Sequence, residues 1–565
     1  NQDLGFRAVE QLLLDDGWDS HEIWNLVVGD MYAEGTDQEY DEYTGSTGQD
    51  ILMSGIASCS VLYGGNGQDI MIGDDLSDYT DDGNFTRETI FELGGNAFDV
   101  AVASAFALSV VEPSMSGIGG RMQAIYFTND SLGGIDGTTQ VPLSYIHDEY
   151  EDGYKFIGIP GVVHGLINLH EGRGRLSLEK LIQPAINLAN NGFELTRGNA
   201  MRLNYAASHL ANNSKTDKYF LSNSIYQVGD TLIQKDLANV LNEISNNGID
   251  GFYSGWVADK IVKDMESHGG YVTLDDLRDY KSGNSVLVSG EFDKYSVHSL
   301  HLPSFGPIVI QLVQLLGSWP NGIETPEDYI NMFYSISQYV YSNSRELQFF
   351  PDSLKNIISH DYNNRLSNKI SKECCSKKLI HDNQDGNTAH ISVVDSYDNT
   401  VSLTQTVGPL MGSGVITDSL GFVYATTMGS YLGITEANQR AYSHISPTII
   451  LKNNSPVMVL GAAGGSRIPT SIAQVIYRHL YLDDDLYSSV TKFRVHPDAE
   501  EALIEYHNGV EFDFDPDSIL FKYDLIDSPA RFGRVQAISR VNELNKWIGV
   551  SDPDWEGTVF NSDFK

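Results

Sequence analysis

The sequence GNTAHISVVDSYDNTVSLTQTVGPLMGSG runs from Gly386 to Gly414. Its two arms, 388–394 and 400–406, alternate in character and are rich in β-branched residues, so they predict a β-hairpin. Thr388 opens the first strand, and Thr406 ends the second. If the chain were cut before Thr388, this residue would carry a hydroxyl nucleophile and a free α-amine to act as its base. Threonine is also a common strand former, so the hairpin alone leaves a purely structural role open.

Charge is the least ordinary part of the composition. The 565 residues include 36 basic and 76 acidic side chains, for a formal net charge of −40. Such a field repels nucleic acid and anionic membranes, which excludes both as expected partners. Hydrophobic residues make up 41% of the chain and charged residues 20%, as in soluble globular proteins. We interpret the excess acid as a solvated surface rather than as one acidic site.

Cysteine content and hydropathy exclude two further classes. Cys59, Cys374 and Cys375 are too few for a disulfide framework, and no zinc-ligand spacing accompanies them. The longest apolar run, 100–111, is too short to span a bilayer. The chain begins with Asn1 rather than Met, so a removed signal peptide would not be visible, and we expect an extracellular or periplasmic protein.

The first 83 residues form an acidic extension that contains a short repeat. The repeat region covers 45–76, where the segment 45–52 is echoed by 64–71, and both copies place an Asp after Gly-rich turns. The pattern resembles the calcium-binding repeats of repeats-in-toxin proteins, in which carbonyl and carboxylate oxygens bind the ion. Asp50, Asp69 and Asp74 are the expected ligands. Two copies bury little apolar surface, so a Gly-rich region without calcium is the alternative.

Beyond residue 88 the chain carries a series of short motifs in a specific order. They are GGNAFD (94–99), VEP (111–113), GIGG (117–120), PGVVHGL (160–166), GRL (174–176), QPA (183–185), GFYSG (251–255), GGYVT (269–273), PSFGP (303–307), TAH (388–390), GSG (412–414), SPT (446–448) and GGSRIP (464–469). As an ordered set over about residues 88–545, they resemble the γ-glutamyltranspeptidase, or glutathione hydrolase, family. The first eighty or so residues lie outside the match.

This resemblance implies a fold, a maturation step and a catalytic apparatus. The family has the four-layer αββα architecture of the N-terminal-nucleophile hydrolases and cleaves itself into two subunits. By similarity the cut falls between Asn387 and Thr388, which divides the chain into a large-subunit part, 84–387, and a small-subunit part, 388–565. Thr388 would be the nucleophile and Thr406 would orient it. Catalysis would need no cofactor.

The glycine pair Gly464-Gly465 completes the expected apparatus. The pair follows an apolar strand predicted at 457–460 and precedes a helix predicted from about Thr470. Bare glycines let backbone N–H groups approach a developing oxyanion closely. Without the resemblance, the same pair would be read as an ordinary strand-to-helix turn.

Recognition of the substrate head group is where the sequence departs from the family. The arginine that holds the α-carboxylate is replaced by Thr138, an asparagine by Gly408, and two acids by Thr427 and Ser430. The family's serine pair corresponds to Ser443 and His444, which we expect to bind substrate. Arg121, where the family usually has a small residue, is a candidate replacement anion contact.

These observations predict a self-processing N-terminal threonine amidohydrolase or acyltransferase. It would cleave a γ-glutamyl or related small-molecule amide through an acyl-enzyme on Thr388, with altered head-group specificity. The alternative is a family member with little or no activity that acts as an extracellular calcium-dependent binding protein. The acceptor and the acyl group are left open by the sequence.

Overall fold

The computed structural model describes most of the chain beyond residue 90 and two short strands before it. The described residues are 61–63, 70–73, 90–91, 93–146, 153–210, 217–220, 225–349, 354–372, 387–429, 436–498, 501–506, 513–527, 533–541, 546–553 and 557–561. All of them belong to one compact unit, residues 45–565. The polypeptide runs without a break through Asn387 and Thr388, so the structure is that of the uncut chain.

Two antiparallel sheets of seven strands each form the centre of this unit. The first consists of β2 (Ile70–Gly73), β3 (Arg121–Thr128), β4 (Ser131–Gly137), β7 (Gly283–Asn284), β10 (Asn387–Val394), β11 (Thr400–Gly408) and β19 (Thr558–Asn561), in the order β19-β2-β10-β11-β3-β4-β7. The second consists of β1 (Val61–Tyr63), β8 (Leu287–Phe292), β9 (Tyr295–Leu300), β12 (Thr448–Lys452), β13 (Ser455–Ala463), β17 (Arg534–Val541) and β18 (Lys546–Val550), in the order β1-β18-β17-β13-β12-β9-β8. The predicted hairpin is therefore β10–β11, at the middle of the first sheet.

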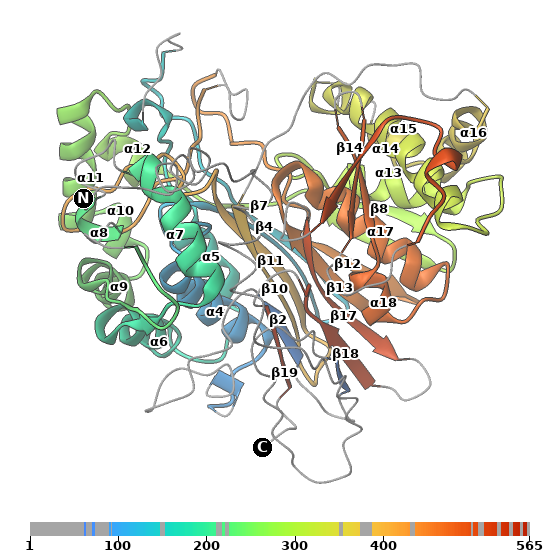
Figure 1. Cartoon of the computed structure of the whole chain (residues 1–565). Helices are drawn as coiled ribbons and strands as arrows, with labels where there is room; N and C mark the ends of the chain where they lie inside the picture. The colour runs from blue at the N-terminus through green and yellow to red at the C-terminus, as the bar shows by residue number, and fades with distance from the viewer. Residues whose placement is uncertain are drawn as a thin grey trace. The chain divides into compact units, whose positions relative to one another are not determined.

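Helices cover the outer face of each sheet (Figure 1). The layer on the first sheet contains α4 (Ala97–Val111), α5 (Val162–His170), α6 (Leu178–Asn191), α7 (Arg197–Leu210), α8 (Asp217–Phe220), α9 (Lys235–Asn247), α10 (Asp250–Tyr253), α11 (Gly255–His268) and α12 (Leu274–Asp279). The layer on the second contains α13 (Gly306–Gly317), α14 (Pro326–Phe349), α15 (Leu354–Ile357), α16 (His360–Ile370), α17 (Ile468–Leu480) and α18 (Leu486–Thr491). The order helix, sheet, sheet, helix confirms the predicted four-layer architecture.

Smaller elements lie at the margins of these layers. They are the 3₁₀ turns η2 (Gly153–Phe156), η4 (Gly465–Arg467) and η5 (Pro516–Ser518), the strand pair β5 (Phe193–Glu194) and β6 (Thr231–Leu232), and the three-stranded sheet β14 (Arg494–Pro497), β15 (Ala502–Tyr506) and β16 (Tyr523–Asp527).

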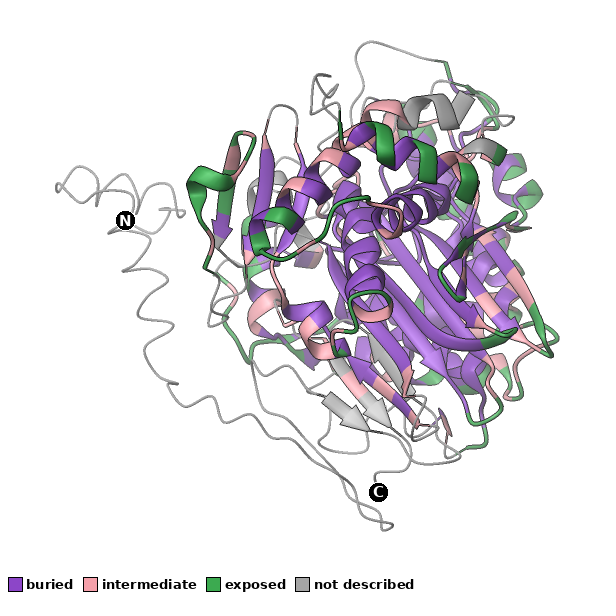
Figure 2. Ribbon diagram, turned by 90° about the vertical axis from the view of Figure 1, so that its right-hand side faces the viewer, coloured by how far each residue is buried: buried purple, intermediate pink, exposed green. Residues whose placement is uncertain are grey.

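The central strands are buried on both faces, as Figure 2 shows by their continuous burial. Along β10, β11 and β3, alternate residues pack under α4 and α5, while the others face the second sheet. The layer between the sheets is apolar at one end, with Ile125, Phe127 and Val394 against Val459 and Ile538. Its other end is polar, and that end contains Thr388.

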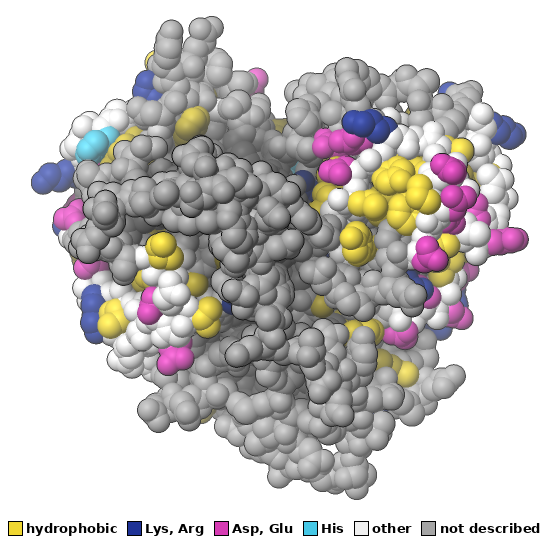
Figure 3. All heavy atoms as spheres, viewed as in Figure 1, with side chains coloured by type: hydrophobic (Ala, Val, Ile, Leu, Met, Phe, Trp, Pro, Cys, Tyr) yellow, Lys and Arg dark blue, Asp and Glu magenta, His cyan; other side chains and the backbone are white. Residues whose placement is uncertain are grey.

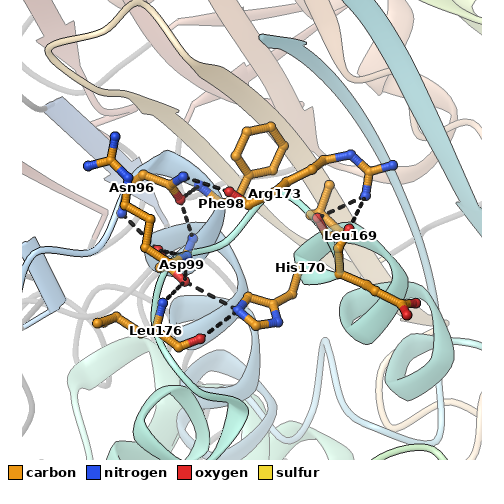
Figure 4. Close-up of polar contacts among 9 residues, drawn as sticks. Asn96, Phe98, Asp99, Leu169, His170, Arg173 and Leu176 are labelled. Atoms are coloured by element: carbon orange, nitrogen blue, oxygen red, sulfur yellow. Dashed lines mark hydrogen bonds and ion pairs between the residues drawn. The ribbon is translucent and has the colours of Figure 1, made fainter. Parts of the chain in front are cut away.

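The N-terminus of α4 is held by polar contacts with α5 and the segment that follows it (Figure 4). Asn96 and Asp99 form a capping box, and Asp99 also accepts hydrogen bonds from the backbone N–H groups of Arg175 and Leu176 and contacts His170 at 3.3 Å. Burial alone would raise the pKa of Asp99, but the hydrogen bonds outweigh it and lower the pKa.

The cap also reaches the turn of the hairpin. The backbone N–H of Ala97 donates to the carboxylate of Asp395 at 3.2 Å. The same carboxylate accepts from the backbone N–H groups of Tyr397 and Asn399 and so closes the turn between β10 and β11. The turn end of the hairpin is thereby held against α4.

The N-terminal extension contributes two strands to these sheets. β2, from the second repeat copy, pairs antiparallel with β10 and with β19, and β1 pairs with β18. The predicted calcium ligands Asp50, Asp69 and Asp74 lie outside the described residues. On the face in Figure 3, acidic side chains are spread over the described surface rather than gathered in one patch.

Candidate active site

A row of three polar residues crosses the middle of the first sheet. Thr388 on β10 pairs with Thr406 on β11, which pairs with Arg121 on β3. Residues directly opposite each other in antiparallel strands point to the same face, so all three side chains face the second sheet. Each is at most 3% exposed. The structure thus brings Arg121, from a distant part of the sequence, beside the two threonines of the predicted hairpin.

The strand pairing is irregular at the peptide bond predicted to be cut. Asn387 pairs with Gly408 while Thr388 pairs with Thr406, so Val407 is an extra residue on β11. The Val407 N–H donates to the Met115 carbonyl at 3.1 Å instead of to β10. Such a bulge bends the strand and redirects the neighbouring groups. Here it frees the Asn387–Thr388 peptide from the regular ladder.

The hydroxyl of Thr406 lies at this bulge between two backbone groups. It accepts a hydrogen bond from the Gly408 N–H at 2.9 Å and donates to the Asn387 carbonyl oxygen. That carbonyl belongs to the predicted scissile bond. A donor already placed on its oxygen polarises the carbonyl and stabilises negative charge that develops there.

His390 lies two residues after Thr388 on the same face of β10, and the sequence marked it only as part of a motif. Its ring nitrogens contact the hydroxyls of Thr404 at 2.8 Å and Ser392 at 3.0 Å. Burial disfavours the charged imidazolium and lowers the pKa of His390 to about 3. His390 is therefore neutral, and with so low a pKa it is a poor base at neutral pH.

The predicted glycine loop lies at the same end of the layer between the sheets. On β13, Gly461 packs so closely on the His390 ring that a Cβ there would come within 2.2 Å of it. From this contact, β10 runs back to Thr388 and β13 runs on to Gly464, in the direction away from the apolar end. Gly464 and Gly465 have φ values of 135° and 60°, which favour glycine. The strand-loop-helix order is as predicted, with α17 starting at Ile468.

A second set of contacts holds this loop from behind. The Tyr341 hydroxyl on α14 donates to the Ser466 carbonyl at 2.6 Å. The Thr470 hydroxyl donates to the Arg467 carbonyl at 2.9 Å and lies 2.9 Å from the ring of His496. The contacts of Tyr341 and His496 were not predicted, because α14 and β14 are distant in sequence from this loop.

Residues 135–142 and 424–429, here called the head-group wall, hold two of the substituted positions. Thr138 is fully buried, and its hydroxyl donates to Asp136 at 2.5 Å. Its carbonyl accepts from the Tyr280 hydroxyl and from Arg440. The Thr427 hydroxyl donates to the Thr139 hydroxyl at 3.0 Å. Both substituted threonines thus bond within the protein. Ser430 lies outside the described residues.

Ser443 and His444 are buried on the segment that leads into β12. The Ser443 N–H donates to the Pro303 carbonyl at 2.8 Å, and the His444 ring lies 4.4 Å from that of Phe305, centre to centre. Ser443 and His444 therefore pack against residues 303–305. Burial lowers the pKa of His496 well below its usual range, and the charges of Arg467 and His444 act in the same direction.

The described residues show neither a metal-binding cluster nor a membrane-spanning helix. They contain no group of three or more His, Cys, Asp or Glu side chains placed to hold a metal ion. No helix in the described ranges is both long and apolar enough to cross a membrane.

Comparisons with known proteins agree with this arrangement. The sequence pattern of the gamma-glutamyltranspeptidase family matches residues 86–561. The glutathione hydrolase proenzyme of Pseudomonas sp. (strain A14) is 30% identical over 472 residues, covering 76% of this chain and 82% of the relative. That of Escherichia coli (strain K12) is 28% identical over 513 residues, covering 82% and 87%.

A solved structure shows the same fold. The cephalosporin acylase from Bacillus halodurans superposes with a TM-score of 0.76 at 20% sequence identity, covering 93% of this chain and 98% of the acylase. The extent of the family match and the Pseudomonas relative decide the assignment: this chain belongs to the gamma-glutamyltranspeptidase family and is a hydrolase or transferase of that kind.

Proposed function

We propose that this chain is a self-processing amidohydrolase or acyltransferase that works through an acyl-enzyme on Thr388. The observation that carries the proposal is the Thr406 hydroxyl, which donates to the Asn387 carbonyl at a bulge in the strand pairing. A strand threonine with only a structural role needs neither the bulge nor that donor. The relatives named proenzymes support the maturation step by analogy.

Maturation begins when the Thr388 hydroxyl oxygen attacks the Asn387 carbonyl carbon. The carbonyl oxygen becomes negative and is stabilised by the Thr406 hydroxyl. The C–N bond then breaks, the proton lost by the Thr388 hydroxyl passes to the nitrogen, which becomes the α-amine of Thr388, and an ester links Asn387 to the Thr388 oxygen. Water hydrolyses this ester, which leaves a carboxylate on Asn387 and a free hydroxyl on Thr388.

Turnover repeats this chemistry on the substrate. The freed α-amine takes the proton of the Thr388 hydroxyl as its oxygen attacks the substrate amide. His390 is buried and its pKa is low, so the α-amine rather than His390 acts as the base. Backbone N–H groups of the Gly464–Gly465 loop stabilise the oxyanion, the proton passes to the leaving amine, and the acyl group stays on Thr388. Water or an acceptor amine then removes it.

The substrate we propose is a γ-glutamyl or related small-molecule amide with an altered head-group contact. The relatives' name, glutathione hydrolase, supports the γ-glutamyl class. The hydroxyls of the head-group wall at Thr138 and Thr427 support the alteration, because both are engaged within the protein.

The test combines maturation and trapping. Freshly purified chain should separate into two fragments on a denaturing gel, with Thr388 as the new N-terminus. Thr388→Ala should stay intact and lose at least about a thousandfold in amide hydrolysis, since no other group replaces the nucleophile. Thr388→Ser is the matched control and should still mature. After quenching, mass spectrometry should find the acyl group on Thr388. An active or self-cleaving Thr388→Ala protein would refute the mechanism.

A further inference from the structure

Tyr341 is joined to the glycine loop by a chain of two hydrogen bonds. Its hydroxyl donates to the Ser466 carbonyl at 2.6 Å. The peptide group that carries this carbonyl also carries the N–H of Arg467, which donates to the Gly464 carbonyl at 3.2 Å. That second peptide group carries the N–H of Gly465. The chain therefore ends on one of the N–H groups that are proposed to stabilise the oxyanion.

Such a chain transmits direction, because a trans peptide group is planar and its carbonyl and N–H point opposite ways. A donor that fixes the carbonyl of one peptide group therefore fixes the N–H of the same group. Glycine has no side chain to restrain its own backbone, so the loop depends on restraint from outside. Here the Tyr341 hydroxyl restrains the direction of the Gly465 N–H. Hydrogen bonds in a chain also polarise one another, which strengthens the last donor.

The Tyr341 ring is itself held in place. It packs edge to face on the ring of His496, with ring centroids 5.4 Å apart and an angle of 88° between the planes. The His496 ring in turn lies 2.9 Å from the Thr470 hydroxyl, in the first turn of α17. A functional group is positioned precisely only when packing locks the side chain that holds it. The ring contact therefore gives the hydroxyl a defined direction.

The hydrogen bond from Tyr341 also joins the two parts that the predicted cut would separate. Tyr341 lies on α14, in the large-subunit part 84–387, whereas Ser466 belongs to the small-subunit part 388–565. After maturation, the nucleophile and the glycine loop would be on one polypeptide and the hydroxyl that orients the loop on the other. The large-subunit part would thus contribute to the geometry of a site whose reacting groups it does not carry.

We propose that Tyr341 is a positioning residue for turnover, whose hydroxyl orients the Gly465 N–H toward the oxyanion through the two peptide groups. This inference rests on the proposed function, since the loop has that role only if Thr388 forms an acyl-enzyme. Tyr341 acts through the loop and is not itself a catalytic residue. During maturation the Thr406 hydroxyl stabilises the carbonyl oxygen, so the loss of the Tyr341 hydroxyl should slow turnover and leave maturation unchanged.

The experiment uses Tyr341→Phe, which removes the hydroxyl and keeps the ring. Its kcat should fall by roughly tenfold, less than the loss of a whole oxyanion donor, because the donor remains and only its direction is released. KM should change by less than about twofold, since the oxyanion forms only after the substrate has bound. Kinetics are measured on whichever of γ-glutamyl, butanoyl and phenylacetyl anilide the parent cleaves fastest. The Thr388 fragment should appear on a denaturing gel at the parent's rate.

Tyr219→Phe is the matched control. The Tyr219 hydroxyl accepts from the Ser419 N–H at 2.7 Å and donates to the Asp236 carboxylate at 2.8 Å, so it too joins the two subunit parts. It lies on α8, in the helix layer of the first sheet, whereas the glycine loop follows β13 of the second (Figure 1). Tyr219→Phe should lower the urea midpoint at least as much as Tyr341→Phe and leave kcat within about twofold of the parent.

The outcomes separate this inference from the function on which it rests. An unchanged kcat in Tyr341→Phe, or an equal fall of kcat in Tyr219→Phe, would overturn the positioning role and leave the threonine mechanism standing. A loss that appears in KM, or a Tyr341→Phe chain that no longer matures, would overturn it too, because the inference limits Tyr341 to turnover. A parent chain that does not mature, or that cleaves none of the three anilides, would overturn both proposals.

Discussion

The β10–β11 hairpin and the head-group wall lie at the same end of the molecule but differ in how they use threonine. On the hairpin, the Thr406 hydroxyl acts on the backbone carbonyl at the predicted cut. In the wall, the hydroxyls of Thr138 and Thr427 bond to Asp136 and Thr139, inside the protein. The same side-chain type is thus directed at the reacting bond in one region and withdrawn into the scaffold in the other.

Under the proposed function, bond cleavage and substrate recognition can change independently in this fold. Cleavage would depend on groups fixed by the strand register of the hairpin and by the glycine loop. Recognition would depend on side chains of the head-group wall, where substitution leaves that register intact. Variants in the hairpin should therefore affect every substrate alike, whereas variants in the wall should leave cleavage intact.

Thr406→Val tests the hairpin and should have the largest effect. Valine keeps the shape of the side chain but removes the donor to the Asn387 carbonyl. Removing one oxyanion donor typically costs about 10²- to 10³-fold in rate, so maturation should slow by about a hundredfold. The appearance of the Thr388 fragment on a denaturing gel, followed over time, measures this rate.

Thr406→Ser is the matched control for that experiment, because it retains the hydroxyl. It should mature within about tenfold of the parent chain. Maturation of Thr406→Val at the parent's rate would show that the hydroxyl does not act on the scissile carbonyl, and the contrast between hairpin and wall would disappear.

The buried imidazole of the hairpin gives the second prediction, for stability. In the folded chain the pKa of His390 is about 3, against 6.5 for an ordinary histidine. The unfolded chain then binds more protons between these values, so stability falls as the pH drops below about 6.5. Between pH 7.5 and 5 the expected contribution of this residue is a loss of about 2 kcal/mol.

Urea unfolding of the uncut Thr388→Ala chain at the two pH values measures this loss without interference from maturation. His390→Gln, made in the same background, should be less stable at pH 7.5 but should lose about 2 kcal/mol less on acidification. If His390→Gln lost as much stability on acidification as its Thr388→Ala parent, His390 would not be a buried neutral ring. His390 would then compete with the free α-amine for the role of base.

Much of the hairpin and the glycine loop could be predicted from the sequence, because both follow local rules. The alternation of residues 388–394 and 400–406 located β10 and β11 to within two residues. The glycine pair marked a strand-to-helix turn, although α17 begins at Ile468 rather than near Thr470. Local periodicity and turn chemistry are sufficient for elements of this kind.

The long-range contacts that shape the candidate active site around the hairpin and the glycine loop could not be predicted from the sequence. The bulge at Val407 depends on the carbonyl of Met115, almost three hundred residues earlier in the chain. The close contact of Gly461 with His390 joins two different sheets. Tyr341 reaches the glycine loop from a helix of the other subunit part. Each of these is a long-range contact that only the packed layers bring about.

Thr427→Val tests the wall and should have the smallest effect. It removes the hydrogen bond to the Thr139 hydroxyl at little change in volume, which should cost about 1 kcal/mol of stability. The rates of maturation and of amide hydrolysis should stay within about twofold of the parent. Thr139→Val and the double variant complete a cycle, whose coupling energy should account for most of that loss.

A loss of maturation in Thr427→Val comparable to that in Thr406→Val would contradict this division. It would mean that the wall takes part in cleaving the bond, because a conservative change outside the catalytic hairpin would then act on the transition state. If instead Thr427→Val changes only the stability, the threonines of the wall have a structural role. Substrate specificity would then have to come from residues other than these two threonines.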